Sequence, residues 1–323
     1  MTSSPTVASA PPRTSATSII EDARRGHRAL FTFAVLMAAL AVVTAGLAVL
    51  DQRTLLGAPL WFKPLKFAIS TAAYTFTLAW MLGQLPRPAL RRSGWTIVIA
   101  LGLEMVIIVG QAARGERSHF NIDGTLNTVL FNVMGVSIGV LYVCTLLIAI
   151  RFLREPRHDA AFALALRLGL VVTLIGMAVG FIMVALEAHT VGVPDGGPGL
   201  PLVGWSTTGG DLRVGHFVGL HGLQALPLLA AGLATLARRW APAARLDELT
   251  QSRIVVTAAT GYALAVVLLT VQALRAQPLL APDPVTALSW AAVVGLTGLA
   301  LVAVVRRPAV LSPASPTSPG AGS

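Results

Sequence analysis

The chain has a single cysteine and few charged residues. Cys144 lies inside an apolar run, so the sequence contains no disulfide framework and no CxxC metal or redox motif. Charged residues make up 12% of the 323 residues, about half of the roughly 25% that is usual in soluble domains. P-loop, HExxH, GxSxG and CxxCH motifs are also absent, which disfavours the commonest enzymes that a motif identifies.

Hydrophobic residues, by contrast, make up 55% of the chain, and the mean hydropathy is +0.74. This composition excludes water as the main solvent and predicts an integral membrane protein. The formal charge of +10 does not indicate nucleic-acid binding, because the basic residues stand in short clusters between long apolar runs, as topology signals do. We therefore expect the lipid bilayer, and no nucleic acid, as the main partner.

Eight apolar segments reach or approach the roughly 20 residues that a helix needs to cross a bilayer core about 30 Å thick. Each must be helical, because lipid offers the backbone no hydrogen-bond partner. The predicted fold is all-α, a polytopic bundle of about eight spans within residues 29–307. The spans are approximately Ala29–Leu50, Pro64–Leu82, Gly94–Ala113, Thr128–Phe152, Phe162–Leu186, Val214–Ala237, Arg253–Leu274 and Val285–Val305.

Five clusters of arginines predict the orientation of the spans. One cluster precedes the first span, three fill every second connection and one follows the last span, so all five fall on one side. By the positive-inside rule this side is cytoplasmic, and we expect the plasma membrane of a bacterium. The clusters are Arg24, Arg25 and Arg28; Arg87, Arg91 and Arg92; Arg151, Arg154 and Arg157; Arg238, Arg239 and Arg245; and Arg306 and Arg307.

The two ends of the chain are predicted to be disordered cytoplasmic tails, residues 1–28 and 308–323. They are rich in Ser, Thr, Pro, Ala and Gly and poor in large apolar side chains that could pack.

A polar stripe runs along the third predicted span. Glu104 lies near the middle of this span, and Gln111, Arg114 and Ser118 continue its helical face within about 80° at roughly 100° per residue. Ionisable groups at bilayer depth are candidates for function. The alternative is a glutamate that hydrogen-bonds a neighbouring helix for packing.

The stripe leads into a dense polar run, residues 114–121, which includes Arg117, His119 and Asn121. The run either contributes to a binding site or forms a solvated loop, in which Asp123 or Thr125 caps the next helix.

The second span opens with Lys63 and Lys66 on either side of Pro64, a residue suited to the first helical position. The two lysines crowd a helix N-terminus that already carries partial positive charge, so this arrangement calls for a negative partner. The partner is either a phosphate or carboxylate of a ligand, or Glu104 in an ion pair with Lys66. Lysines that snorkel beside the interfacial Trp61 are the alternative.

The sixth span carries the most specific pattern, over residues 210–227. On a helical wheel with His216 at zero, Gln224 falls at roughly 80° and His221 at roughly 140°, while three glycines fall on the opposite face. We predict that the glycine face lets a neighbouring helix approach closely and that the polar face binds a ligand, although packing hydrogen bonds are the alternative for the histidines. Pro227 is expected to bend the helix just below Gln224. The glycines are Gly215, Gly219 and Gly222.

His216 and His221 are five residues apart, which is not the spacing of three or four with which one helix chelates a metal. A metal or haem would therefore need ligands from elsewhere, and His119, Glu187 and His189 are the candidates. The Gly- and Pro-rich connection between residues 189 and 211 is either a lid or a flexible spacer.

Three runs resemble those of uncharacterised bacterial multi-span membrane proteins, a resemblance that implies no mechanism. The runs are Lys63 to Phe67, Arg114 to Asn121 and His216 to His221.

These polar groups favour binding or transport of a small, polar or anionic solute in a pocket open to the extracytoplasmic side, enclosed by the second, third and sixth spans. The alternatives are a haem- or metal-binding redox protein and a structural or assembly subunit. No cofactor and no catalytic residue is predicted. The expected ligand-binding residues are Lys63, Lys66, Glu104, Gln111, Arg114, Arg117, His119, Asn121, Arg213, His216, His221 and Gln224.

Overall fold

The computed structural model describes residues 16–84, 90–154, 160–239 and 246–306. Within these ranges the chain forms ten helices and four strands of two residues each, so the predicted all-helical class is confirmed. Residues 1–15 and 308–323 of the predicted tails lie outside them.

Seven helices are long and apolar enough to cross a membrane, and the bent pair α7 and α8 makes an eighth span if it is counted as one. This is the architecture of a multi-pass integral membrane protein, and the spans begin and end close to the predicted positions. The seven are α2 (Arg28–Leu50), α3 (Phe62–Gly83), α4 (Arg91–Arg114), α5 (Thr125–Arg154), α6 (Ala160–Leu186), α9 (Glu248–Leu274) and α10 (Pro284–Arg306), and the pair is α7 (Leu212–Leu220) and α8 (Gly222–Arg239).

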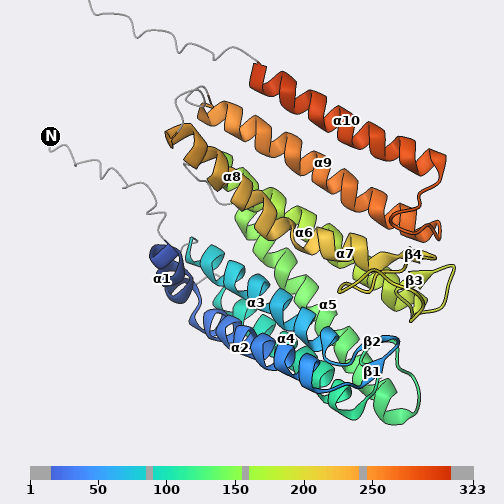
Figure 1. Cartoon of the computed structure of the whole chain (residues 1–323). Coiled ribbons are helices and arrows are strands. Elements are labelled where there is room, and N and C mark those ends of the chain that lie inside the picture. The colour runs from blue at the N-terminus through green and yellow to red at the C-terminus, as the bar shows by residue number, and fades with distance from the viewer. Residues whose placement is uncertain (1–15, 85–89, 155–159, 240–245, 307–323) are drawn as a thin grey trace, which may run out of the picture.

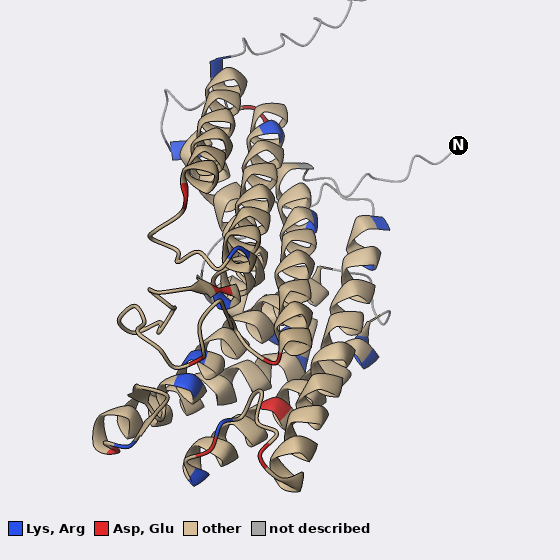
Figure 2. Ribbon diagram, turned by 90° about the vertical axis from the view of Figure 1, so that its right-hand side faces the viewer, with Lys and Arg blue, Asp and Glu red and all other residues tan. Residues whose placement is uncertain are grey.

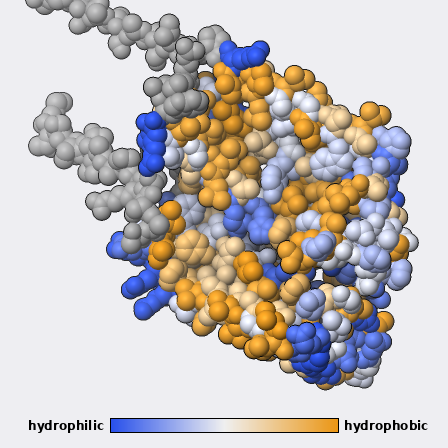
Figure 3. Space-filling model, in the orientation of Figure 1, coloured by the Kyte–Doolittle hydropathy of each residue, from blue (hydrophilic) through white to orange (hydrophobic). Residues whose placement is uncertain are grey.

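The spans are arranged in two bundles (Figure 1). Helices α2 to α5 pack together in the N-terminal bundle, helices α6 to α9 pack in the C-terminal bundle, and α10 lies along α9 at the edge. The bundles meet where α6 contacts α5, and Leu166, Leu170 and Leu223 join the hydrophobic core of the N-terminal bundle. Apolar side chains such as Val106 and Leu228 are exposed on the sides of the bundles, and Figure 3 shows how much of one side is hydrophobic. Such sides fit a lipid environment.

One end of the molecule, the loop end, carries most of the irregular structure. It holds β1 (Thr54–Leu55), β2 (Ala58–Pro59), the 115–124 connection, and the 187–211 connection with β3 (Thr190–Val191) and β4 (Gly210–Asp211). Both strand pairs are antiparallel. Figure 2 views this end face on and shows acidic and basic segments close together in the connections. The opposite end, the arginine end, carries the described members of the arginine clusters.

Part of the segment that we predicted as a tail is helical. Helix α1 (Ala16–Gly26) packs against α3 at the arginine end, with Ala23 fully buried. A Cβ at Gly26 would lie 2.1 Å from the Ala79 carbonyl oxygen, so the two backbones touch. Only glycine permits this approach, and no local pattern in the tail indicates the partner helix.

Hydrogen bonds of the His27 ring connect the start of α2 to the start of α4. Its Nδ1 accepts a hydrogen bond from the backbone N–H of Leu30, and Nε2 lies 3.0 Å from the Arg91 carbonyl oxygen. A carbonyl can only accept, so Nε2 carries the proton and the ring is a neutral N-cap. A Cβ at Gly94 would lie 2.3 Å from this ring.

The sixth span breaks earlier than predicted. Helices α7 and α8 meet at His221 with a bend of 45°, whereas Pro227 lies inside α8 without ending it. Side chains of neighbouring helices bond to carbonyls beside the break. Thr173 of α6 donates to the Leu220 oxygen at 3.2 Å, and Tyr262 of α9 donates to the Val218 oxygen at 2.6 Å. These bonds replace helical ones that the break removes.

The predicted glycine face is confirmed as a close-packing surface. A Cβ at Gly219 would lie 2.4 Å from the Cα of Gly176 on α6, and one at Gly222 would lie 2.6 Å from Val172. Gly215 faces α9 instead, where a Cβ would lie 2.6 Å from the Thr270 hydroxyl oxygen. The face therefore fits α7 between α6 and α9.

Replacing Gly219 with alanine should separate α6 from α7. Because the obstructing atoms belong to the backbone of Gly176, we expect Gly219→Ala to lower the free energy of unfolding by about 1–3 kcal/mol. The control is Gly232→Ala in α8, where nothing lies within 4 Å of the new Cβ. Thermal unfolding of the two variants in detergent tests this, and equal melting temperatures would contradict it.

Labelling of single cysteines should reveal the orientation in the membrane. In a Cys144→Ala background, Leu280→Cys at the loop end should react with an impermeant maleimide in intact cells. Leu249→Cys at the arginine end should react only after permeabilisation, and both side chains are exposed. The reverse pattern would place the loop end in the cytoplasm.

Candidate functional site

The polar run after α4 bonds mostly to itself. The Gln111 side-chain amide donates to Asn127 Oδ1 at 2.9 Å and to the Arg117 carbonyl oxygen at 3.1 Å, and its own oxygen accepts from Arg114 at 2.6 Å. All hydrogen-bonding groups of this buried amide are thus engaged. Gln111 ties the 115–124 connection to the start of α5.

Two more predicted site residues stabilise the same connection. Asn121 donates to Glu116 at 3.2 Å and to the Arg117 carbonyl oxygen at 3.0 Å, while the Arg117 guanidinium pairs with Asp123 at 3.1 Å. Gln111, Arg114, Arg117 and Asn121 therefore build the connection that presents His119.

Glu104 and Lys63 lie in the N-terminal bundle with no such partners. Glu104 is 3% exposed, and in the part of the chain that the structure describes neither carboxylate oxygen has a hydrogen-bond partner. Lys63, in the first turn of α3, is half-buried with its Nζ 5.9 Å from the centre of the Phe67 ring. The two charges interact electrostatically but form no ion pair.

His119 shares a neighbour with Lys63, because the Phe67 ring centre lies 5.9 Å from the Lys63 Nζ and 5.5 Å from the centre of the His119 ring. Burial holds the pKa of His119 well below its ordinary value, and the positive charges of Lys63, His216 and His189 lower it further. Phe120, the next residue, packs against the C-terminal bundle, so the connection that carries His119 contacts both bundles. We call Lys63, Glu104, His119, His189 and His216 the inter-bundle cluster. The first three residues belong to the N-terminal bundle and its connections, and the last two belong to the C-terminal half.

Two carboxylates lie beside the ring of His189, whose buried Nδ1 has no hydrogen-bond partner among the described residues. Asp195 lies 3.3 Å from His189 Nδ1 and accepts the Thr190 hydroxyl at 2.6 Å. Asp211, the N-cap of α7, lies 4.0 Å from the same ring and is bonded to the Arg213 guanidinium at 2.6 Å. Burial lowers the pKa of His189, as does the charge of Arg213, while the two aspartates oppose this effect.

Asp195 and Asp211 were not among the predicted site residues. The position of Asp211 directly before a glycine-rich helix is a capping signal that would have indicated its role. The proximity of Asp195 to His189 depends on the fold of the connection.

The bend at His221 separates the polar groups that we expected on one arc of the sixth span. His216 donates from Nδ1 to the Gly176 carbonyl oxygen of α6 at 2.8 Å. His221 instead lies 3.3 Å from Gln224, whose amide donates to the Thr77 hydroxyl of α3 at 3.2 Å. This pair links the two bundles, and Figure 3 shows hydrophilic atoms at the centre of the side where the bundles meet.

The 187–211 connection extends over the start of α3. The Lys66 ammonium donates to the Val203 carbonyl oxygen at 3.1 Å, and a Cβ at Gly196 would lie 3.1 Å from Leu56 of the first strand pair. Of the two interpretations of this segment, an ordered cover fits these contacts better than a spacer.

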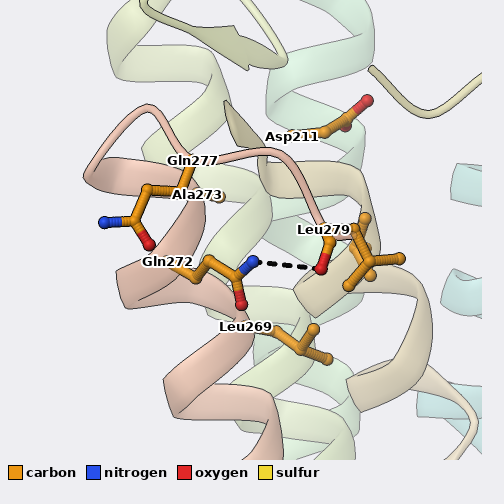
Figure 4. A pocket seen from close by; sticks show the side chains of 7 residues that line it. Asp211, Leu269, Gln272, Ala273, Gln277 and Leu279 are labelled. Carbon is orange, nitrogen blue, oxygen red and sulfur yellow. Dashed lines mark hydrogen bonds between the residues drawn. The ribbon is translucent and has the colours of Figure 1, made fainter. Parts of the chain in front are cut away.

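A small pocket lies at the same end between α7, α9 and the turn before α10 (Figure 4). Its main polar group, Gln272, donates to the carbonyl oxygens of Pro278 and Leu279 and accepts from Trp290. Because this amide is satisfied internally, the pocket offers a ligand little polar recognition.

Among the described residues, no three His, Cys, Asp or Glu side chains are grouped so that they could hold a metal ion. Comparisons of the chain with protein-family models, curated proteins and solved structures returned no match.

Acidification should weaken the fold through His119 and His189. Because both pKa values lie below the ordinary value of about 6.5, the unfolded chain takes up protons first as the pH falls through that value. Stability present at pH 7.5 is therefore lost towards pH 5. The melting temperature of the His119→Gln/His189→Gln double variant should fall less over this range than that of the wild type. An equal fall would assign the pH dependence to other groups.

Proposed function

We propose that this protein binds a small anionic solute in the inter-bundle cluster, and that the solute arrives from the loop end, which faces the extracytoplasmic side. The observation that carries the proposal is that Lys63 is half-buried and has no ion-pair partner among the described residues. Taking a cation partly out of water without an ion-pair partner is costly, and an anion in contact with Lys63 would reduce that cost.

The surroundings of Lys63 add positive potential. Trp61, the N-cap of α3, makes no side-chain hydrogen bond to the first turn, so the helix N-terminus keeps its partial positive charge. Lys66 adds a second positive charge, and its ammonium donates to the neutral carbonyl oxygen of Val203. Nearby negative charge is largely engaged, since Asp211 pairs with Arg213 and Asp195 holds the 187–211 connection.

The position of the cluster between two bundles supports transport as the use of this binding. Transporters commonly place a site between two structural halves and next to a discontinuous helix. Here the halves contribute different members of the cluster, and α7 ends in the break at His221. Two hydrogen bonds connect the halves, one from Gln224 to Thr77 and one from Lys66 to Val203. Both can break while the hydrophobic core of each bundle stays packed.

Anion binding is tested with purified protein in detergent at pH 7.5, with sodium sulfate, acetate and phosphate compared against sodium gluconate at equal ionic strength. A bound anion at about 100 times its Kd stabilises the folded state by about 2.7 kcal/mol, and hence raises the melting temperature. Lys63→Met should abolish this rise.

The matched control is Arg275→Gln, which removes a positive charge of the loop end that is already paired with Asp283 and lies outside the inter-bundle cluster. It should keep the rise in melting temperature. An equal rise in the Lys63→Met variant, or no rise in the wild type with any of the three anions, would disprove binding at this site.

A further inference from the structure

Glu104 is the buried acid that anion binding leaves unexplained. It stands in the middle of α4 at 3% exposure, and within the described ranges both of its oxygens lack a donor. In such a site an ionised carboxylate is destabilised by the loss of its hydration, whereas a protonated carboxyl group is destabilised much less. The site therefore favours a proton on Glu104 unless a positive charge stands by.

Lys63 is the one charged group that acts on Glu104 within the described residues. The other ionisable groups on the helices packed against α4 lie elsewhere. Arg28 begins α2, and Arg151 and Arg154 end α5 at the arginine end. On α3, Lys66 bonds to Val203 and Tyr74 bonds to Thr145 of α5, while Tyr142 of α5 packs against Phe181 of α6. Cys144 of α5 is buried and bears no charge as a thiol.

One positive charge thus faces two possible negative partners. In the empty protein, Lys63 can offset an ionised Glu104. Once an anion binds Lys63, an ionised Glu104 would leave two negative charges to share one cation in a medium of low dielectric constant, where their repulsion is strong. A proton taken up from the solvent removes this repulsion.

We propose that Glu104 is a proton-binding site coupled to the anion site, so that one proton binds at Glu104 with each anion at Lys63. This inference rests on the proposed anion binding and adds the proton as a second bound species. If the protein transports its solute, anion and proton cross together.

The coupling has a definite sign. Linkage is reciprocal, so an anion that promotes protonation of Glu104 binds more tightly as the pH falls. Over the pH range in which Glu104 is ionised in the empty protein, the affinity should fall about tenfold for each unit of rising pH. His119 and His189 do not contribute above pH 7.5, because their lowered pKa values keep both rings neutral there.

Calorimetric titration with sodium sulfate between pH 7.5 and 9.5 tests the proposal, because sulfate does not titrate in this range. Binding heats in two buffers of different ionisation enthalpy count the protons taken up. We expect uptake to rise towards one proton per sulfate as the pH increases, and the affinity to fall in parallel.

Two variants identify the group that takes up the proton. Glu104→Gln imitates the protonated acid, so it should bind sulfate at pH 9.5 with the affinity of the wild type at pH 7.5 and take up no proton. Glu104→Asp keeps a titratable carboxyl group and should keep the uptake, which also guards against a general effect of substitution on folding.

Proton uptake that persists in Glu104→Gln would assign the proton to Lys63 and overturn the proposal. Sulfate binding without uptake in the wild type at any pH in the range would also overturn it, while leaving anion binding intact. A wild-type protein that does not bind sulfate would instead contradict the binding proposal on which this inference rests.

Discussion

Backbone groups inside a bilayer must find their hydrogen bonds within the protein, and the arrangement around α7 follows from this constraint. The chain leaves helical geometry at His221, where Thr173 and Tyr262 bond to carbonyls beside the break. Both donors reach the break because the glycines of α7 let α6 and α9 approach closely. The same approach directs His216 to the Gly176 carbonyl oxygen. The glycine face therefore positions part of the polar site as well as packing the bundle.

The polar residues of the loop end fall into two groups according to whether their hydrogen bonds are satisfied. Gln111 and Asn121 are bonded within the 115–124 connection, and Arg213 is paired with Asp211. Satisfied networks of this kind rigidify a segment. Lys63 and Glu104 lack such partners in the part of the chain that the structure describes. An unsatisfied charge in rigid surroundings favours the binding of a ligand or a proton, because binding then requires little reorganisation of the protein.

The inter-bundle cluster needs residues from both bundles. Lys63 and Glu104 come from the N-terminal bundle, whereas His189 and His216 come from the C-terminal half, and the 187–211 connection spans both through Lys66 and Leu56. The inter-bundle cluster therefore depends on how the halves sit together. A change in their spacing would alter the electrostatic environment of every member, since interactions at low dielectric constant depend strongly on distance.

The sequence by itself determined the helical class, the spans and the glycine face, because hydropathy, residue spacing and side-chain size act over one helix at a time. It also indicated Lys63, Glu104, His119 and His216 as residues that are costly to place. Only the tertiary structure decided that α1 packs on α3, that the sixth span breaks at His221 and not at Pro227, and that Asp195 and Asp211 lie beside His189. It also showed that the side-chain amide of Gln111 is fully hydrogen-bonded, whereas Glu104 on the same stripe has no hydrogen-bond partner among the described residues. The physical reason is that hydrogen-bond and charge satisfaction depends on groups brought together from distant parts of the chain, which no local pattern records.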